Sequence, residues 1–159
     1  MRHLKKLILI SLVAYPVFSL FLSCSEEEDC SMNARPMTKC YLYTQSGSTI
    51  LNDTLDSLTI TALGTDSIII NNQKKVHDLS LPLRYTVDST ALILHYSKTL
   101  SDTVIIYQTN VPYFLSMNCG YQMKQTINKV SYSTHKLDSI SIKNAEAGIN
   151  EKENLKLFY

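Results

Sequence analysis

Apolar and polar residues alternate in short runs along most of the chain from Met37 to Tyr159. A period of two is typical of a strand that buries one face, and none of the runs keeps helical spacing for long. Turn signals separate the runs at Asn71–Asn72, Asn110–Pro112 and Ala147–Asn150. The predicted strands are 57–63, 67–70, 90–96, 103–107, 113–117, 121–132, 139–142 and 155–159.

This many short strands at close spacing favours an all-β fold. The type it predicts is an antiparallel β-sandwich, immunoglobulin-like or similar, with about seven to nine strands. An open β-barrel has the same periodicity and is the alternative. The chain from Cys24 onward has the length of one domain, so residues 37–159 are predicted to form a single β-domain.

The first 23 residues follow a different pattern. A basic opening at 1–6 precedes an apolar run at 7–22 that contains no charged residue. This order is typical of a secretory signal peptide, predicted at 1–23. A transmembrane helix is the weaker interpretation, because it needs about 20 apolar residues. The run here is shorter, is interrupted by Pro16 and is followed by acidic residues.

The residues Phe21-Leu22-Ser23-Cys24 resemble the lipobox of bacterial lipoproteins. The resemblance implies that Cys24 becomes the new N-terminus and is diacylated through its sulfur, which anchors the protein to the outer membrane. More than one acyl chain is needed for stable anchoring. The alternative is ordinary cleavage that leaves Cys24 as a thiol, and an exposed thiol is a liability in an oxidising compartment.

A block of acidic residues follows the lipobox. Like charges in a row do not pack, so residues 24–36 are predicted to form a solvated tether. The block also resembles the export signal that sends Bacteroidetes lipoproteins to the cell surface. Display on the cell surface and retention on the periplasmic face of the outer membrane are both open. The residues of the block are Ser25, Glu26, Glu27, Glu28 and Asp29.

Three cysteines remain once Cys24 is set aside, which allows one disulfide and one free thiol. Cys30 lies at the end of the tether, and Cys119 precedes a glycine in a predicted turn. We expect these two to form the disulfide. Cys40 lies in an alternating run, where an inward-facing cysteine is usually a small core residue.

Six of the seven aspartates after Asp29 directly precede a serine or threonine. Such pairs cap turns that lead into strands, because both side chains bond nearby backbone amides. The pairs also resemble the acceptor motif of the general O-glycosylation system of Bacteroidetes. A calcium site is the weaker interpretation, because the aspartates are scattered singly. The candidate acceptors are Thr54, Ser57, Ser67, Ser89, Thr103 and Ser139.

Composition and motifs argue against several functions. Removing the signal peptide takes away three of the 15 basic residues and leaves 12 against 14 acidic residues, which makes nucleic acid an unsuitable partner. The chain lacks a His-Glu-x-x-His helix and a Gly-x-Ser-x-Gly elbow. We therefore predict no catalytic residue, metal or cofactor. The rival hypothesis is a thiol enzyme or hydrolase that uses Cys40 or Cys119 with a histidine.

Several short motifs occur together along the chain. They are Asp29-Cys30, Leu81-Pro82-Leu83-Arg84, Asp88-Ser89-Thr90, Cys119-Gly120-Tyr121 and a closing strand at 155–159. In this order they resemble a family of small Bacteroidetes lipoproteins whose domain is of unknown function. The resemblance implies a single β-domain and supports the pairing of Cys30 with Cys119, and it implies no active site. Cys40 departs from the family pattern.

The function expected from these observations is that of a lipid-anchored, non-catalytic protein of the cell envelope. It would act as a binding or accessory module for another outer-membrane component. Recognition of a glycan is the alternative, because the chain has ten tyrosines, although it has no tryptophan. A row of exposed tyrosines would favour a glycan, and an unpaired edge strand would favour a protein partner.

Overall fold

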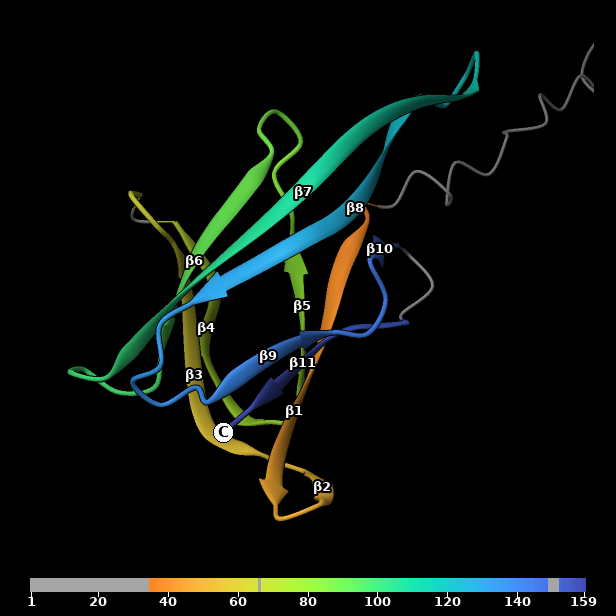
Figure 1. The fold of residues 1–159 in the computed structure, drawn as a ribbon. Coiled ribbons are helices and arrows are strands. Elements are labelled where there is room, and N and C mark those ends of the chain that lie inside the picture. Colours follow the sequence, from red (N-terminus) through yellow and green to blue (C-terminus); the bar gives the residue numbers. More distant parts are fainter. Residues whose placement is uncertain (1–34, 66, 149–151) are drawn as a thin grey trace, which may run out of the picture.

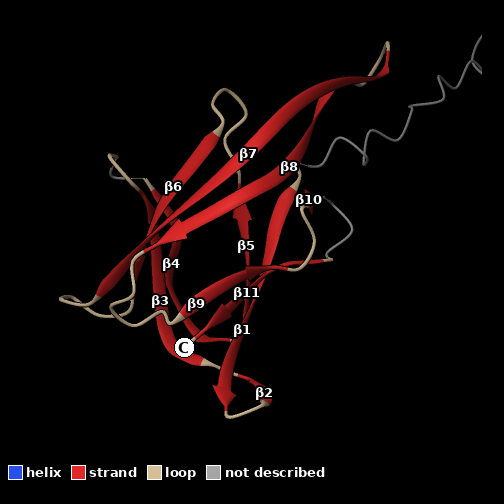
Figure 2. Cartoon of the chain, in the orientation of Figure 1, coloured by secondary structure: helices blue, strands red, loops and turns tan. Residues whose placement is uncertain are grey.

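The computed structural model describes residues 35–65, 67–148 and 152–159. These residues form eleven strands in two sheets and contain no helix (Figure 2). The all-β prediction is therefore confirmed. No described segment is a helix long and apolar enough to cross a membrane.

The five-stranded sheet is built around β1 (Met37–Ser46). One side of β1 pairs in parallel with β11 (Glu153–Phe158), and β11 pairs in turn with β9 (Ser139–Ile142). β1 also pairs in antiparallel fashion with β2 (Thr49–Asn52) and β5 (Asp78–Pro82). Strands from the two ends of the described chain thus lie side by side at the centre of this sheet (Figure 1).

The six-stranded sheet is antiparallel throughout and has the order β10-β8-β7-β6-β3-β4. It curls around the five-stranded sheet, and its two longest strands continue outward at one end (Figure 1). The strands are β3 (Leu55–Ala62), β4 (Ile68–Val76), β6 (Ser89–His95), β7 (Ser101–Ser116), β8 (Gly120–Tyr132) and β10 (Glu146–Ala147).

The alternation along the strands places one apolar face of each sheet against the other. In β1 the inward positions include Cys40 and Leu42, and in β6 they include Leu92 and Leu94. These side chains are at most 1% exposed and belong to one continuous core. Burying each large aliphatic side chain contributes about 1.5–3 kcal/mol, so this core holds the two sheets together.

The structure differs from the sequence prediction in four respects. There are eleven strands rather than seven to nine, and the β1–β11 pair is parallel. The turn predicted at Asn110–Pro112 is wrong, because β7 runs through it. Proline is tolerated there because β7 has lost its β6 neighbour, so no ladder bond needs the missing N–H. Asn71–Asn72 likewise lies within β4, where a register shift and the positive φ of Asn72 bend the strand.

Candidate binding surface

The outer parts of β7 and β8 form a two-stranded ribbon that leaves the six-stranded sheet (Figure 1). β6 pairs with β7 only as far as Tyr107, and β10 pairs with β8 only at Gln125 and Thr126. Beyond these points no other described strand flanks the ribbon. We call residues 109–124 the arm. At about 3.4 Å per residue, its β7 strand reaches roughly 24 Å beyond the sheet.

The arm is uncharged from Thr109 to Met123 and has a largely apolar surface. The side chain of Met117 is 90% exposed and that of Tyr121 is 72% exposed. Val111, Tyr113 and Phe114 are also exposed. A small domain rarely gathers so many apolar side chains at one projecting end unless that end meets a partner.

Contacts within the arm stiffen it despite its exposure. Phe114 and Tyr121 are paired across the ribbon, and their rings meet edge to face with centroids 5.3 Å apart. On the neighbouring pair, the hydroxyl of Tyr113 donates a hydrogen bond to the side-chain oxygen of Gln122. Gly120 closes the turn with a φ of +70°, a conformation that favours glycine.

The turn at the tip of the arm contains Cys119, which is disulfide-bonded. Its backbone N–H donates to the Ser116 hydroxyl oxygen at 3.1 Å. Cys30 lies outside the described residues, so its pairing with Cys119 stays a prediction. Cys40 is a free cysteine in the core.

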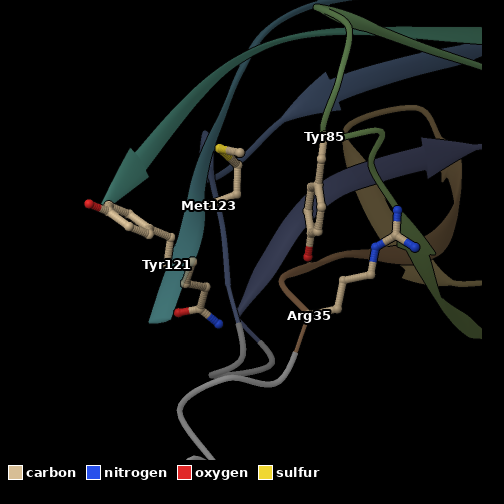
Figure 3. A pocket seen from close by; sticks show the side chains of 5 residues that line it. Arg35, Tyr85, Tyr121 and Met123 are labelled. Atoms are coloured by element: carbon tan, nitrogen blue, oxygen red, sulfur yellow. The ribbon is translucent and has the colours of Figure 1, made fainter. Parts of the chain in front are cut away.

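A cleft of about 280 Å³ lies between the loop that carries Tyr85 and the β8 strand of the arm. Arg35 donates to the Leu83 carbonyl at 2.6 Å, and its guanidinium carbon lies 4.8 Å from the centre of the Tyr85 ring. Burial raises the pKa of Tyr85, while the charge of Arg35 opposes that shift. Figure 3 shows Tyr85 and Arg35 on one side of the cleft and Tyr121 and Met123 on the other. Gln122 completes the lining.

Buried amides fix the loop that carries Tyr85. The Gln108 amide donates to the carbonyls of Arg84 and Val87 at 3.1 and 3.0 Å. The Gln125 amide donates to the same Arg84 carbonyl at 3.1 Å and to the Asn110 side chain at 2.8 Å. Buried polar groups of this kind specify one arrangement because each needs its partner. The inner face of β7 and β8 thus changes from apolar to polar where it leaves the core.

Asp102 has a structural role that the sequence analysis missed. It is 1% exposed and accepts hydrogen bonds from the Ser133 hydroxyl and from the backbone N–H groups of His135, Lys136 and Leu137, at 2.6–2.9 Å. Burial by itself raises the pKa of Asp102, but these donors outweigh it and hold the pKa well below the usual range. Asp102 lies near the start of β7 and organises the turn that follows β8.

The arrangement around Asp102 does not match a catalytic triad. A triad places the histidine between the nucleophile and the carboxylate. Here Asp102 lies between the other two groups, because it accepts from the Ser133 hydroxyl and its Oδ1 lies 3.1 Å from the His135 Nδ1. Ser133 therefore directs its proton to Asp102 and is not activated by His135.

The Cys40 thiol lacks the properties of a nucleophile. It is fully buried, and burial raises its pKa far above the usual value, with Lys39 opposing only weakly. Its one hydrogen-bond contact within the described chain is the Thr38 carbonyl, at 3.7 Å. The described residues also contain no cluster of three or more His, Cys, Asp or Glu that could hold a metal ion.

Several predicted sites lie outside the described residues. They are the signal peptide, Cys24, the acidic block from Ser25 to Asp29, and Cys30. Among the glycosylation candidates, Thr54 and Ser67 are exposed on the surface. Ser57, Ser89, Thr103 and Ser139 are half-buried.

The described chain is an all-β domain with a closed core and a projecting apolar arm. The model of a family of unknown function, DUF6452, matches residues 57–159, and the chain belongs to this family. The match begins within β3 and leaves out β1, although β1 pairs with β11 at the other end of the chain. No curated protein matches the chain, and no solved structure matches it either. The predicted resemblance to a family with a domain of unknown function is thus confirmed.

Proposed function

We propose that this protein is a lipid-anchored, non-catalytic module of the cell envelope that contacts another outer-membrane component through its arm. The observation that carries this proposal is the uncharged, exposed surface of residues 109–123. Apolar side chains held away from the core on a stiff ribbon suit a contact with a partner better than they suit solvent.

The proposed location rests on two features. The leader and the lipobox at Cys24 support export and acylation. The disulfide at Cys119 supports an oxidising compartment, where such bonds persist. We propose that the partner of Cys119 is Cys30 and that the acidic residues between Cys24 and Cys30 form a short tether. The domain is then held at the outer membrane, on the cell surface or on the periplasmic face.

Peptide mapping by mass spectrometry of protein taken from native membranes tests the location. We expect acyl chains on Cys24, a Cys30–Cys119 linkage before reduction, and release of the protein from the membrane by Cys24→Ser. Protease added to intact cells then separates surface display from the periplasmic face. An unacylated Cys24 in membrane-bound protein would contradict the proposed anchor.

The same map tests glycosylation, which we propose for the acceptors that the chain exposes. Thr54 and Ser67 are exposed, so they are expected to carry sugar most often. Thr103 is expected to carry none, because its neighbour Asp102 is buried and fully engaged. Sugar on Thr103 alone would contradict this order.

Glycan recognition is a second candidate function, favoured by the cleft beside the arm. Tyr85 and Tyr121 provide aromatic faces, and Arg35 and Gln122 provide hydrogen-bonding groups, which is a common set for a sugar site. If a glycan binds there, Tyr85→Ala should abolish its binding, whereas Tyr107→Ala, which alters a tyrosine outside the cleft, should not. Equal binding by both variants would exclude the cleft.

A further inference from the structure

The tip of the arm has the composition of a surface that meets a membrane. Its exposed side chains at Phe114, Met117 and Tyr121 are apolar or aromatic, and no charged side chain lies within its turn. Tyrosine is enriched where a membrane meets water, because its ring is apolar and its hydroxyl is polar. A surface that binds a protein partner usually includes some charged residues, which fix the orientation of the partner.

The proposed Cys30–Cys119 disulfide would bring the tip close to the proposed lipid anchor. Only six residue steps separate Cys24 from Cys30, and a fully extended chain of that length spans about 20 Å. With Cys30 bonded to Cys119, the acylated end of the chain stays within that reach of the turn. The arm tip can then reach the bilayer that holds the anchor.

We infer that the arm tip of this protein inserts into the headgroup region of the bilayer that holds its lipid anchor. The inference rests on the proposed acylation of Cys24 and on the proposed Cys30–Cys119 disulfide. The tip gives the protein a second attachment beside the acyl chains and fixes the orientation of the β-domain. Since no other described strand flanks the ribbon to pair its backbone, only the turn and its side chains enter, to a depth of about 5–10 Å.

The absence of tryptophan from the chain makes a direct test simple. Phe114→Trp places one fluorophore at the tip, and Leu51→Trp places one on the β1–β2 hairpin at the opposite end of the domain (Figure 1). The native side chains are 50% and 52% exposed, so the two probes are matched. Each acylated, full-length variant is reconstituted in vesicles of equal parts phosphatidylethanolamine and phosphatidylglycerol with brominated acyl chains.

We expect the brominated lipid to quench the tryptophan of Phe114→Trp and to leave that of Leu51→Trp unchanged. Mass spectrometry of the same samples reports whether Cys24 is acylated. If Cys24 is acylated and neither tryptophan is quenched, the inference is wrong while the proposed anchor stands. The inference is also wrong if iodide quenches the tip tryptophan in vesicles but not in native membranes, because a protein or glycan then covers the tip.

Unacylated protein reports the contribution of the arm to membrane binding without that of the anchor. Flotation of Cys24→Ser with the same vesicles measures the attachment by the arm alone, and adding Met117→Ser should weaken it about tenfold. Adding Leu51→Ser instead should have no effect. Equal flotation by both double variants would overturn the inference, and circular dichroism confirms that each remains folded.

Discussion

β7 and β8 run through both the body of the protein and its arm, but the two regions differ in what covers these strands. Val104 and Ile106 on the inner face of β7 are at most 2% exposed, because the five-stranded sheet packs against them. Phe114 continues the same alternation and is 50% exposed. The alternation of apolar and polar residues therefore identifies the apolar face of a strand, while the burial of that face depends on the neighbouring elements.

The largest expected contrast is between one core residue and one arm residue. Leu94→Ala should lower the free energy of unfolding by about 2–5 kcal/mol, because it leaves a cavity in the closed core. Phe114→Ala should lower it by no more than about 1 kcal/mol, because its ring lies outside that core and loses only its cross-strand contact with the exposed Tyr121 ring. Urea unfolding of both variants measures the difference. A similar loss in both would mean that the arm folds as part of the core.

The next effect concerns the carboxylate that organises the turn after β8. Asp102→Asn should destabilise the protein by about 2–4 kcal/mol, because an amide cannot accept all the hydrogen bonds that Asp102 receives. Asp88→Asn is the matched control, because Asp88 also precedes a hydroxyl-bearing residue, Ser89, but is exposed. Equal midpoints for the two variants in urea would contradict the role assigned to Asp102.

The same substitution has an expected signature in pH. The pKa of Asp102 is lower in the folded state, so its stabilisation is complete above the ordinary aspartate pKa of about 4. It is lost as the pH falls further, through the lower pKa of the folded state. The unfolding free energies of wild type and Asp102→Asn should therefore converge in acid. A constant difference from neutral to acidic pH would contradict the assignment.

A smaller effect is expected where the body changes into the arm. Gln108→Ala removes an amide that donates to the carbonyls of Arg84 and Val87, and should cost about 1–3 kcal/mol. Hydrogen exchange should also accelerate in the loop that carries Tyr85. Gln73→Ala on the exposed surface of β4 is the control. It should change neither the free energy of unfolding nor hydrogen exchange in that loop. Unchanged exchange in Gln108→Ala would show that the loop is held by other contacts.

The smallest effect is expected at the ion pair between the arm and β10. The Lys124 ammonium lies 2.7 Å from the Glu146 carboxylate, but both side chains are more than half exposed. Water and salt screen such a pair, so Lys124→Ala should leave the thermal midpoint unchanged within error. A lowered midpoint that disappears at high salt would show that this pair holds the arm in place.

The sequence predicted several strands closely, but no predicted strand covers β2, β5 or β10, and the arm was not predicted, for a physical reason. Ser139–Ile142 was predicted to the residue, and β6 and β8 to within one, because alternation and turn residues are local signals. The arm depends on where β6 and β10 stop pairing with β7 and β8, which is set by distant parts of the chain. Pro112 suggested a turn because proline usually ends a paired strand.

The candidate surface has a recognisable pattern in the sequence. The stretch from Thr109 to Met123 has no charge, and inward positions of its two strands carry Gln108 and Gln125 instead of aliphatic residues. Together these features mark the end of the core. The hydrogen bonds that Asp102 accepts have no such signal in the sequence, because their donors are more than 30 positions away.

The parallel pairing of β1 with β11 sets an order for assembly. Tyr43 pairs with Phe158, and the Tyr43 carbonyl accepts from the Tyr159 N–H at 2.9 Å. A chain that is made with β1 first leaves that strand without its β11 neighbour until the end of the chain follows. Contacts between such distant residues form slowly. A product lacking 153–158 would leave an open edge on β1, so a truncated chain would expose a site for pairing with other chains that the finished chain covers.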